Sequence, residues 1–153
     1  MQFQDSPYRY QRRRTREIVI ANAHQEVKLG ADSAIVYQSM ITSDTLDTEA
    51  CVKQTLDLAA VGCQLVRITA QTVRHAANLE HIANALREKG CHVPLVADIH
   101  FKPEAAMEAV KWVEVVRVNP GNYADSKKFK TREYTEEEYA SELARIEEKF
   151  APL

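Results

Sequence analysis

The sequence has few cysteines and few glycines, and it contains no long apolar run. Its three cysteines in 153 residues, Cys51, Cys63 and Cys91, form no CxxC pair. We therefore expect reduced thiols, and neither a disulfide framework nor a metal site. No apolar stretch approaches the roughly 18 residues of a membrane span, and the N-terminus has no signal-peptide core. The sequence predicts a cytoplasmic protein with no membrane association.

The sequence also has no large excess of positive or negative charge. The 20 basic and 22 acidic side chains give a net charge of −2, which excludes a strong general attraction to nucleic acid or anionic lipid. Arg12, Arg13 and Arg14 are consecutive in a basic segment over residues 1–16, a pattern that also occurs in nucleic-acid-binding arms. We interpret this segment as a solvated tail that leads into the first strand, and we predict no nucleic-acid partner.

Four apolar, β-rich runs recur at a period of about 30 residues, which is the size of a βαβ unit. They cover residues 34–37, 65–68, 93–97 and 113–118. Helical patterns lie between them and cover residues 47–60, 73–89 and 103–110. Because the strands are apolar and joined by helices, we expect them to be parallel and covered on at least one face.

Further elements precede and follow this repeat. Residues 17–20 and 26–29 flank a polar tip, which is typical of a β-hairpin. Thr135 and Glu138 form a capping-box pattern, which predicts that a helix begins there. We predict a basic tail over residues 1–16, followed by a hairpin and four β/α units over residues 17–153.

Two architectures fit this order of elements, an open doubly wound sheet and part of a (β/α)8 barrel. A doubly wound nucleotide-binding fold carries a glycine-rich loop after its first strand. Here the first strand leads into Gln38-Ser39-Met40, without a glycine. A complete barrel takes about 250 residues. If the fold is a barrel, these four units are half of one.

In both architectures the chemistry takes place where the strands end. Arg67 and Arg117 have apolar neighbours within their strands, so each must pair with a carboxylate or bind an anion. Two converging arginines suit a phosphate or diphosphate, which they can hold with bidentate hydrogen bonds. The alternative is a pair of salt bridges to Asp98 and to another carboxylate at a strand end. The equivalent positions of the two arginines favour anion binding.

Asp98 and His100 stand at the end of the third run, and their spacing places both side chains on one face of the strand. They could serve as an acid–base pair, a metal-binding pair or an orienting pair around a substrate, or they could simply form a structural hydrogen bond. After the fourth run, Asn119-Pro120-Gly121-Asn122 has the composition of a turn, whose backbone N–H groups could add to an anion site.

The strand ends carry four strings in a fixed order. They are Val-Tyr-Gln-Ser-Met at 36–40, Leu-Val-Arg-Ile at 65–68, Val-Pro-Leu-Val-Ala-Asp-Ile-His-Phe at 93–101 and Val-Arg-Val-Asn-Pro-Gly-Asn at 116–122. In this order they resemble the family of 4-hydroxy-3-methylbut-2-enyl diphosphate synthase. The resemblance covers about residues 12–123, and residues 124–153 are similar to the longer form of the family, found in plants and some bacteria. The resemblance favours the barrel.

The resemblance implies a fold, an activity and a cofactor. The fold is α/β, and this chain corresponds to the N-terminal half of a (β/α)8 TIM barrel with about four parallel strands, preceded by the hairpin. Family members are oxidoreductases of the methylerythritol phosphate pathway of isoprenoid (terpenoid) biosynthesis. They reductively open a cyclic diphosphate, 2-C-methyl-D-erythritol 2,4-cyclodiphosphate. The electrons pass from a donor such as ferredoxin or flavodoxin through a four-iron four-sulfur (4Fe-4S) cluster in a separate C-terminal domain.

The resemblance also assigns residues. Arg67 and Arg117 match the family's diphosphate-binding arginines at the mouth of the barrel. Asp98 and His100 match polar residues at the same mouth, and we predict them as catalytic. Further substrate-binding positions at the rim are predicted at Gln38, Ser39, Asn119 and Asn122.

The departures from the family pattern concern the region beyond residue 153. The family's cluster ligands, its later barrel strands and its catalytic glutamate lie in that region, so we expect the chain to be truncated. Its three cysteines do not match the cluster ligands, and we predict that the isolated chain holds no iron, is inactive and forms a homo-oligomer. The alternative is a non-catalytic phosphate-binding half-barrel module that self-associates.

Overall fold

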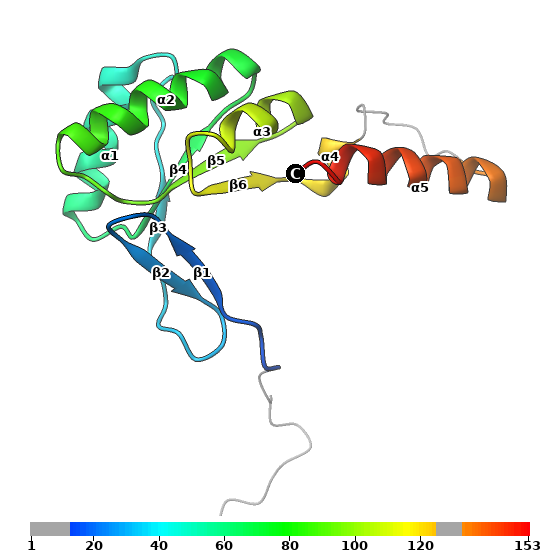
Figure 1. Ribbon diagram of the computed structural model, residues 1–153, viewed down its shortest axis with the longest axis horizontal. Coiled ribbons are helices and arrows are strands. Elements are labelled where there is room, and N and C mark those ends of the chain that lie inside the picture. Colours follow the sequence, from blue (N-terminus) through cyan, green and yellow to red (C-terminus); the bar gives the residue numbers. More distant parts are fainter. Residues whose placement is uncertain (1–12, 125–132) are drawn as a thin grey trace, which may run out of the picture.

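The computed structural model describes residues 13–124 and 133–153 (Figure 1). Residues 1–12, which hold most of the predicted basic tail, and residues 125–132 lie outside the described residues. The elements in chain order are β1 (Ile18–Ala21), β2 (Glu26–Leu29), β3 (Gln38–Met40), α1 (Thr48–Ala60), β4 (Leu65–Thr69), α2 (Val73–Glu88), β5 (Leu95–Ile99), α3 (Pro103–Ala109), β6 (Val115–Val118), α4 (Pro120–Tyr123) and α5 (Glu136–Phe150).

The main sheet has four parallel strands in the order β3, β4, β5 and β6, which is also their order along the chain. The helices α1, α2 and α3 share one buried cluster with this sheet, and Figure 1 shows them together on one side of it. A doubly wound sheet has helices on both faces and reverses its strand order, whereas a barrel adds each β/α unit beside the last. The predicted α/β half-barrel, preceded by a hairpin, is confirmed.

The two faces of the sheet differ because successive side chains of a strand point to opposite sides. Val66 and Ile68 of β4 are buried in the cluster with the helices. Leu65, from the same strand, belongs to a second cluster with Ile20 and Val27 of the hairpin. Since Leu65 begins β4, the hairpin covers this second face, which we call the inner face, at the amino ends of the strands. The carboxyl ends are left for polar side chains.

The hairpin of β1 and β2 is antiparallel, as predicted, and its tip is fixed to the body of the protein. The Asn22 side-chain amide donates to the His92 carbonyl oxygen at 2.9 Å, just before β5. The same amide lies 3.3 Å from the Glu114 carboxylate, which precedes β6. These contacts add to the apolar packing of the hairpin and fix it beneath the sheet.

The first strand of the sheet begins later than the apolar run that predicted it. The run covers residues 34–37, but β3 begins at Gln38. Ile35 is 85% exposed and Tyr37 is 68% exposed. Within the described residues β3 has a hydrogen-bonded neighbour on one side only, and an edge strand leaves such side chains uncovered.

The helices α1, α2 and α3 lie close to the predicted ranges, and the first two begin at residues whose side chains cap them. Asp47 accepts a hydrogen bond from the Ala50 amide and caps α1. The Asn-Pro-Gly-Asn string differs from the prediction, because it begins the four-residue helix α4 rather than forming a simple turn. The Asn119 side chain caps this helix by accepting from the Gly121 amide at 3.1 Å.

The C-terminal helix α5 begins with the predicted capping box between Thr135 and Glu138. It extends away from the sheet, and none of its residues is buried (Figure 1). Two contacts hold the end of this helix. The ring centroid of Phe150 lies 4.6 Å from that of Tyr123 in α4, and the Lys149 ammonium donates to the Ala124 carbonyl oxygen. No helix in the described ranges has the length and apolarity that crossing a membrane requires.

Candidate functional site

The strand register brings the predicted site residues together at the carboxyl end of the inner face. Met40 of β3 pairs with Arg67 of β4, and one row further on Thr69 pairs with Asp98 of β5. Asp98 in turn pairs with Arg117 of β6. Paired residues of parallel strands lie on the same side of a sheet, so all of these side chains start from one face.

Asp98 is the centre of this group, and its side chain is fully buried. Its Oδ2 atom accepts from Arg67 Nε at 2.9 Å and lies 2.7 Å from Arg67 Nη2. Its Oδ1 atom accepts from Arg117 Nη1 at 2.9 Å. A buried carboxylate is tolerated when it is paired and hydrogen-bonded in this way. Both arginines therefore share one carboxylate, whereas the sequence-based alternative expected a separate partner for each.

The arginine pair still carries a surplus of positive charge. Two guanidiniums and one carboxylate leave a net charge of +1. The Arg67 side chain is 29% exposed and that of Arg117 is 41% exposed, so both side chains are partly open to solvent. Each guanidinium has five N–H donors, and Asp98 uses only some of them. The site can therefore attract an anion and donate hydrogen bonds to it.

His100 lies on the same side as Asp98, as the spacing predicted. Its Nε2 atom is 3.5 Å from Asp98 Oδ2, which is longer than a good hydrogen bond. The side chain is 39% exposed, and its ring centroid lies 5.7 Å from that of Phe101. Unlike Asp98, His100 can reach a ligand bound at the mouth.

The predicted rim residues differ in their position along the strands and in the face of the sheet that they occupy. Asn119 directly follows β6 and caps α4, and Asn122 lies within that helix. Gln38 pairs with Leu65 at the start of the strands, two residues before the row of Arg67, and Ser39 pairs with Val66 of the helix-facing core.

Met40 is the residue of β3 that stands beside Arg67, and it is 38% exposed. Sequence reasoning did not include it among the site residues, because a methionine at the end of an apolar run resembles a core residue. Its position two residues after Gln38, on the same side of the strand, was the signal that could have found it.

The cysteines do not suit a metal cluster. Among the residues that the structure describes, no group of three or more His, Cys, Asp or Glu side chains could hold a metal ion. Cys51 is fully buried, and its thiol donates to the Asp44 carbonyl oxygen at 3.2 Å. Burial, together with the charges of Asp47 and Asp44, raises the pKa of this thiol to about 11.

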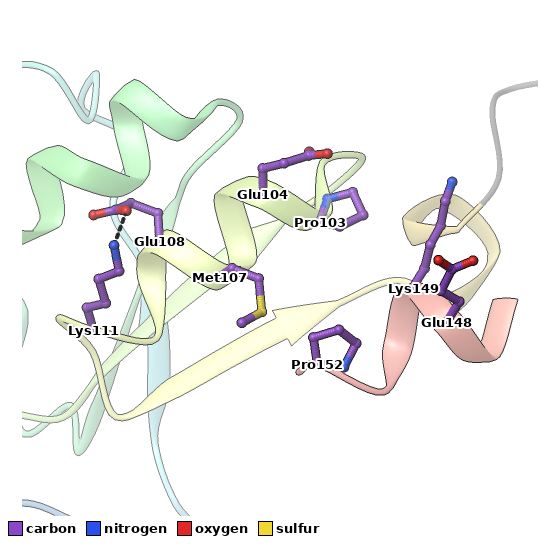
Figure 2. Close-up of a pocket in the computed structure, with 8 residues that line it drawn as sticks. All are labelled: Pro103, Glu104, Met107, Glu108, Lys111, Glu148, Lys149 and Pro152. Atoms are coloured by element: carbon purple, nitrogen blue, oxygen red, sulfur yellow. Dashed lines mark hydrogen bonds and ion pairs between the residues drawn. The ribbon is translucent and has the colours of Figure 1, made fainter. Parts of the chain in front are cut away.

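A separate groove lies elsewhere in the molecule. A groove of about 650 Å³ runs between α3 and the end of α5, and Figure 2 shows its lining. Glu108 and Lys111 pair with each other on one wall, and Glu148 and Lys149 come from the other. None of the predicted site residues lines this groove, so it is separate from the arginine pair.

The fold and the strand-end cluster define a barrel-type α/β protein with a basic site at the carboxyl end of its sheet. Residues 15–143 match the family model described as the GcpE TIM-barrel domain, and the chain belongs to this family. The resemblance seen in the sequence is thereby confirmed.

Three curated relatives carry the same name, 4-hydroxy-3-methylbut-2-en-1-yl diphosphate synthase (flavodoxin). Over 95–99% of this chain, the identity is 61% with the protein of Akkermansia muciniphila, 51% with that of Leptospira interrogans and 46% with that of Chlorobaculum tepidum. The matched region is 25%, 22% and 19% of the length of these relatives, respectively. The chain thus spans a quarter or less of the proteins it matches.

Proposed function

We propose that the polypeptide to which this chain belongs is a 4-hydroxy-3-methylbut-2-enyl diphosphate synthase. It would act in isoprenoid biosynthesis, opening 2-C-methyl-D-erythritol 2,4-cyclodiphosphate by reduction. The names of the relatives support this reaction, and the word flavodoxin in those names supports flavodoxin as the type of electron-donor partner. A cytoplasmic location is part of the same proposal.

The observation that carries the proposal is the convergence of Arg67 and Arg117. They come from β4 and β6, on either side of β5, and meet at one carboxylate on the inner face. Active sites of barrels lie at the carboxyl ends of the strands, where these guanidiniums stand. Two arginines with donors to spare suit the two phosphates of a cyclic diphosphate better than a single small anion.

The contribution of this chain is to bind and orient the substrate. Arg67 and Arg117 hold the phosphates, and the partly exposed side chain of His100, whose Nε2 lies 3.5 Å from Asp98 Oδ2, stands beside them. Asn119 and Asn122 stand at the rim next to Arg117. The family's four-iron four-sulfur cluster supplies the electrons, and the described residues of this chain offer no ligand set for it.

Replacement of the arginines tests the proposal. In the complete polypeptide that the gene encodes, Arg67→Met and Arg117→Met should each weaken binding of the cyclic diphosphate about tenfold or more, because hydrogen bonds to charged groups are lost. Isothermal titration calorimetry measures the affinity. Each single variant leaves Asp98 one arginine partner, so cooperative thermal unfolding should persist.

The matched control is Arg74→Met, which removes an exposed arginine of α2. It should leave the affinity unchanged. If both site variants bind the cyclic diphosphate as tightly as the unmodified protein, Arg67 and Arg117 are not its ligands.

A further inference from the structure

We propose that Asp98 is a positioning residue, which holds the guanidiniums of Arg67 and Arg117 in place before a diphosphate binds. The inference rests on the proposed function, because it takes a diphosphate as the ligand that the arginine pair binds. It differs from the catalytic role that the sequence suggested for Asp98.

The burial of Asp98 separates it from the ligand. Its side chain has no exposed surface, and both carboxylate oxygens are engaged by arginine nitrogens at 2.7–2.9 Å. A general acid or base must come within hydrogen-bond reach of the reacting atoms. The side chains of both arginines are partly exposed, at 29% and 41%, whereas that of Asp98 is not, so the carboxylate acts through the arginines that it binds.

Simple charge attraction does not explain why a carboxylate stands here. Asp98 lowers the charge of the arginine pair from +2 to +1, which by itself weakens the attraction for an anion. A carboxylate between two guanidiniums instead relieves their mutual repulsion and fixes their orientation. Because both side chains are ordered in advance, less rotamer freedom is lost when the ligand binds.

The geometry also points to a difference between the two arginines. Arg67 is held through both Nε and Nη2 on one oxygen, which fixes the plane of its guanidinium. Arg117 is held through Nη1 alone, so more of its donors stay available to the ligand. Arg67 is therefore the more rigid member of the pair.

Asp98→Asn separates positioning from charge. The variant makes the site more positive, yet we expect binding of inorganic pyrophosphate to weaken about tenfold or more, because the arginines lose their fixed orientation. The preference for pyrophosphate over sulfate should fall as well. Calorimetry at constant ionic strength, on the complete polypeptide that the gene encodes, measures both affinities. Pyrophosphate binding by Asp98→Asn that equals or exceeds that of the unmodified protein overturns the proposal.

The matched control removes the same charge elsewhere. Asp57 lies on the exposed side of α1, where it pairs with Lys53 at 2.9 Å. Asp57→Asn should leave pyrophosphate binding unchanged. An equal loss in both variants would show an effect of net charge and overturn the positioning role.

Arg67→Lys provides a second variant in case Asp98→Asn does not unfold cooperatively. It keeps the positive charge but has no planar group for Asp98 to orient. We expect a loss of pyrophosphate affinity as large as in Arg67→Met. Full affinity in Arg67→Lys would show that charge alone suffices, and would overturn the proposal.

A ligand-free measurement distinguishes failure of this inference from failure of the proposed function. In NMR spectra of the unmodified protein, the Arg67 Nε–H should exchange with water much more slowly than that of the exposed Arg74. If the Arg67 Nε–H exchanges slowly but the protein does not bind pyrophosphate, the arginines are positioned and the proposed diphosphate site is refuted. Exchange as fast as that of Arg74 refutes the positioning itself.

Discussion

At the scale of single residues, some buried polar side chains form hydrogen bonds and another does not. Asp98 has both oxygens engaged, and the Thr45 hydroxyl donates to the Thr69 carbonyl oxygen at 2.6 Å. Thr55, on α1, is also fully buried, but its hydroxyl has no hydrogen-bond partner among the described residues. An unpaired buried hydroxyl lowers stability, whereas a paired one supports the fold.

Thr55→Val should therefore stabilise the protein by about 1 kcal/mol, since valine has the same shape without the unpaired hydroxyl. Thr45→Val is the matched control and should destabilise it by about 1 kcal/mol or more, because it leaves the Thr69 carbonyl without its donor. Urea unfolding gives the free energy of unfolding of both variants. Changes of the same sign in the two variants would contradict this interpretation.

The sequence could predict which residues gather at the site, but not how they pair. Arg67, Asp98 and Arg117 follow from the pattern because parallel strands present their carboxyl ends at one edge of a sheet. The strand register determines that one carboxylate binds both arginines. It places Asp98 opposite Arg117 and two residues further along the sheet than Arg67. Residue spacing within a strand carries no information on this register.

At the scale of elements, the hairpin depends on one close approach of the backbone. Gly30 follows β2 with a φ of +84°, and a Cβ atom there would lie 2.2 Å from the Arg16 carbonyl oxygen. The segment at Arg16 leads into β1, so an added side chain would push the two strands of the hairpin apart. Glycine is required here both for its backbone conformation and for the space.

Gly30→Ala should destabilise the protein by clearly more than the ~1–2 kcal/mol that a left-handed backbone costs an alanine. Gly62→Ala is the control, because Gly62 has a similar φ of +94° with nothing within 4 Å of an added Cβ. It should show the conformational cost alone. Equal losses in urea unfolding would mean that the contact at Arg16 is easily relieved.

Elements with local signals could be predicted, and elements that depend on neighbours could not. The helices α1 and α5 begin where Asp47 and Thr135 cap them, and a capping pattern can be recognised in a few consecutive residues. The strand β3 is shorter and later than its apolar run, since a strand exists only where a partner supplies hydrogen bonds. The run at 34–37 has strand composition, but lies at the open edge.

At the scale of the whole molecule, the described part of the chain is a half-barrel with an open edge at β3, and the hairpin covers its inner face only at the amino ends of the strands. Exposed apolar side chains lie in the hairpin and beside β3, and they include Ile18, Val19, Ile35 and Tyr37. An apolar edge of this kind promotes pairing with another chain. The homo-oligomer stays a prediction, and this surface is the observation that supports it.

The isolated 153-residue chain should therefore associate in solution. Light scattering at high micromolar concentration should give the mass of a dimer or a larger species. Ile35→Lys together with Tyr37→Lys should shift the distribution toward the monomer, because charges on an edge oppose pairing. A monodisperse monomer of the unmodified chain would contradict the prediction.

One measurement tests the central claim most directly, a crystal structure of the complete polypeptide that the gene encodes, with 2-C-methyl-D-erythritol 2,4-cyclodiphosphate bound. We predict phosphate oxygens at about 2.7–3.2 Å from guanidinium nitrogens of both Arg67 and Arg117. Asp98 should still hold the two side chains from behind. A cyclic diphosphate that binds at another place, or that contacts neither arginine, would contradict the claim that this strand end is the substrate site.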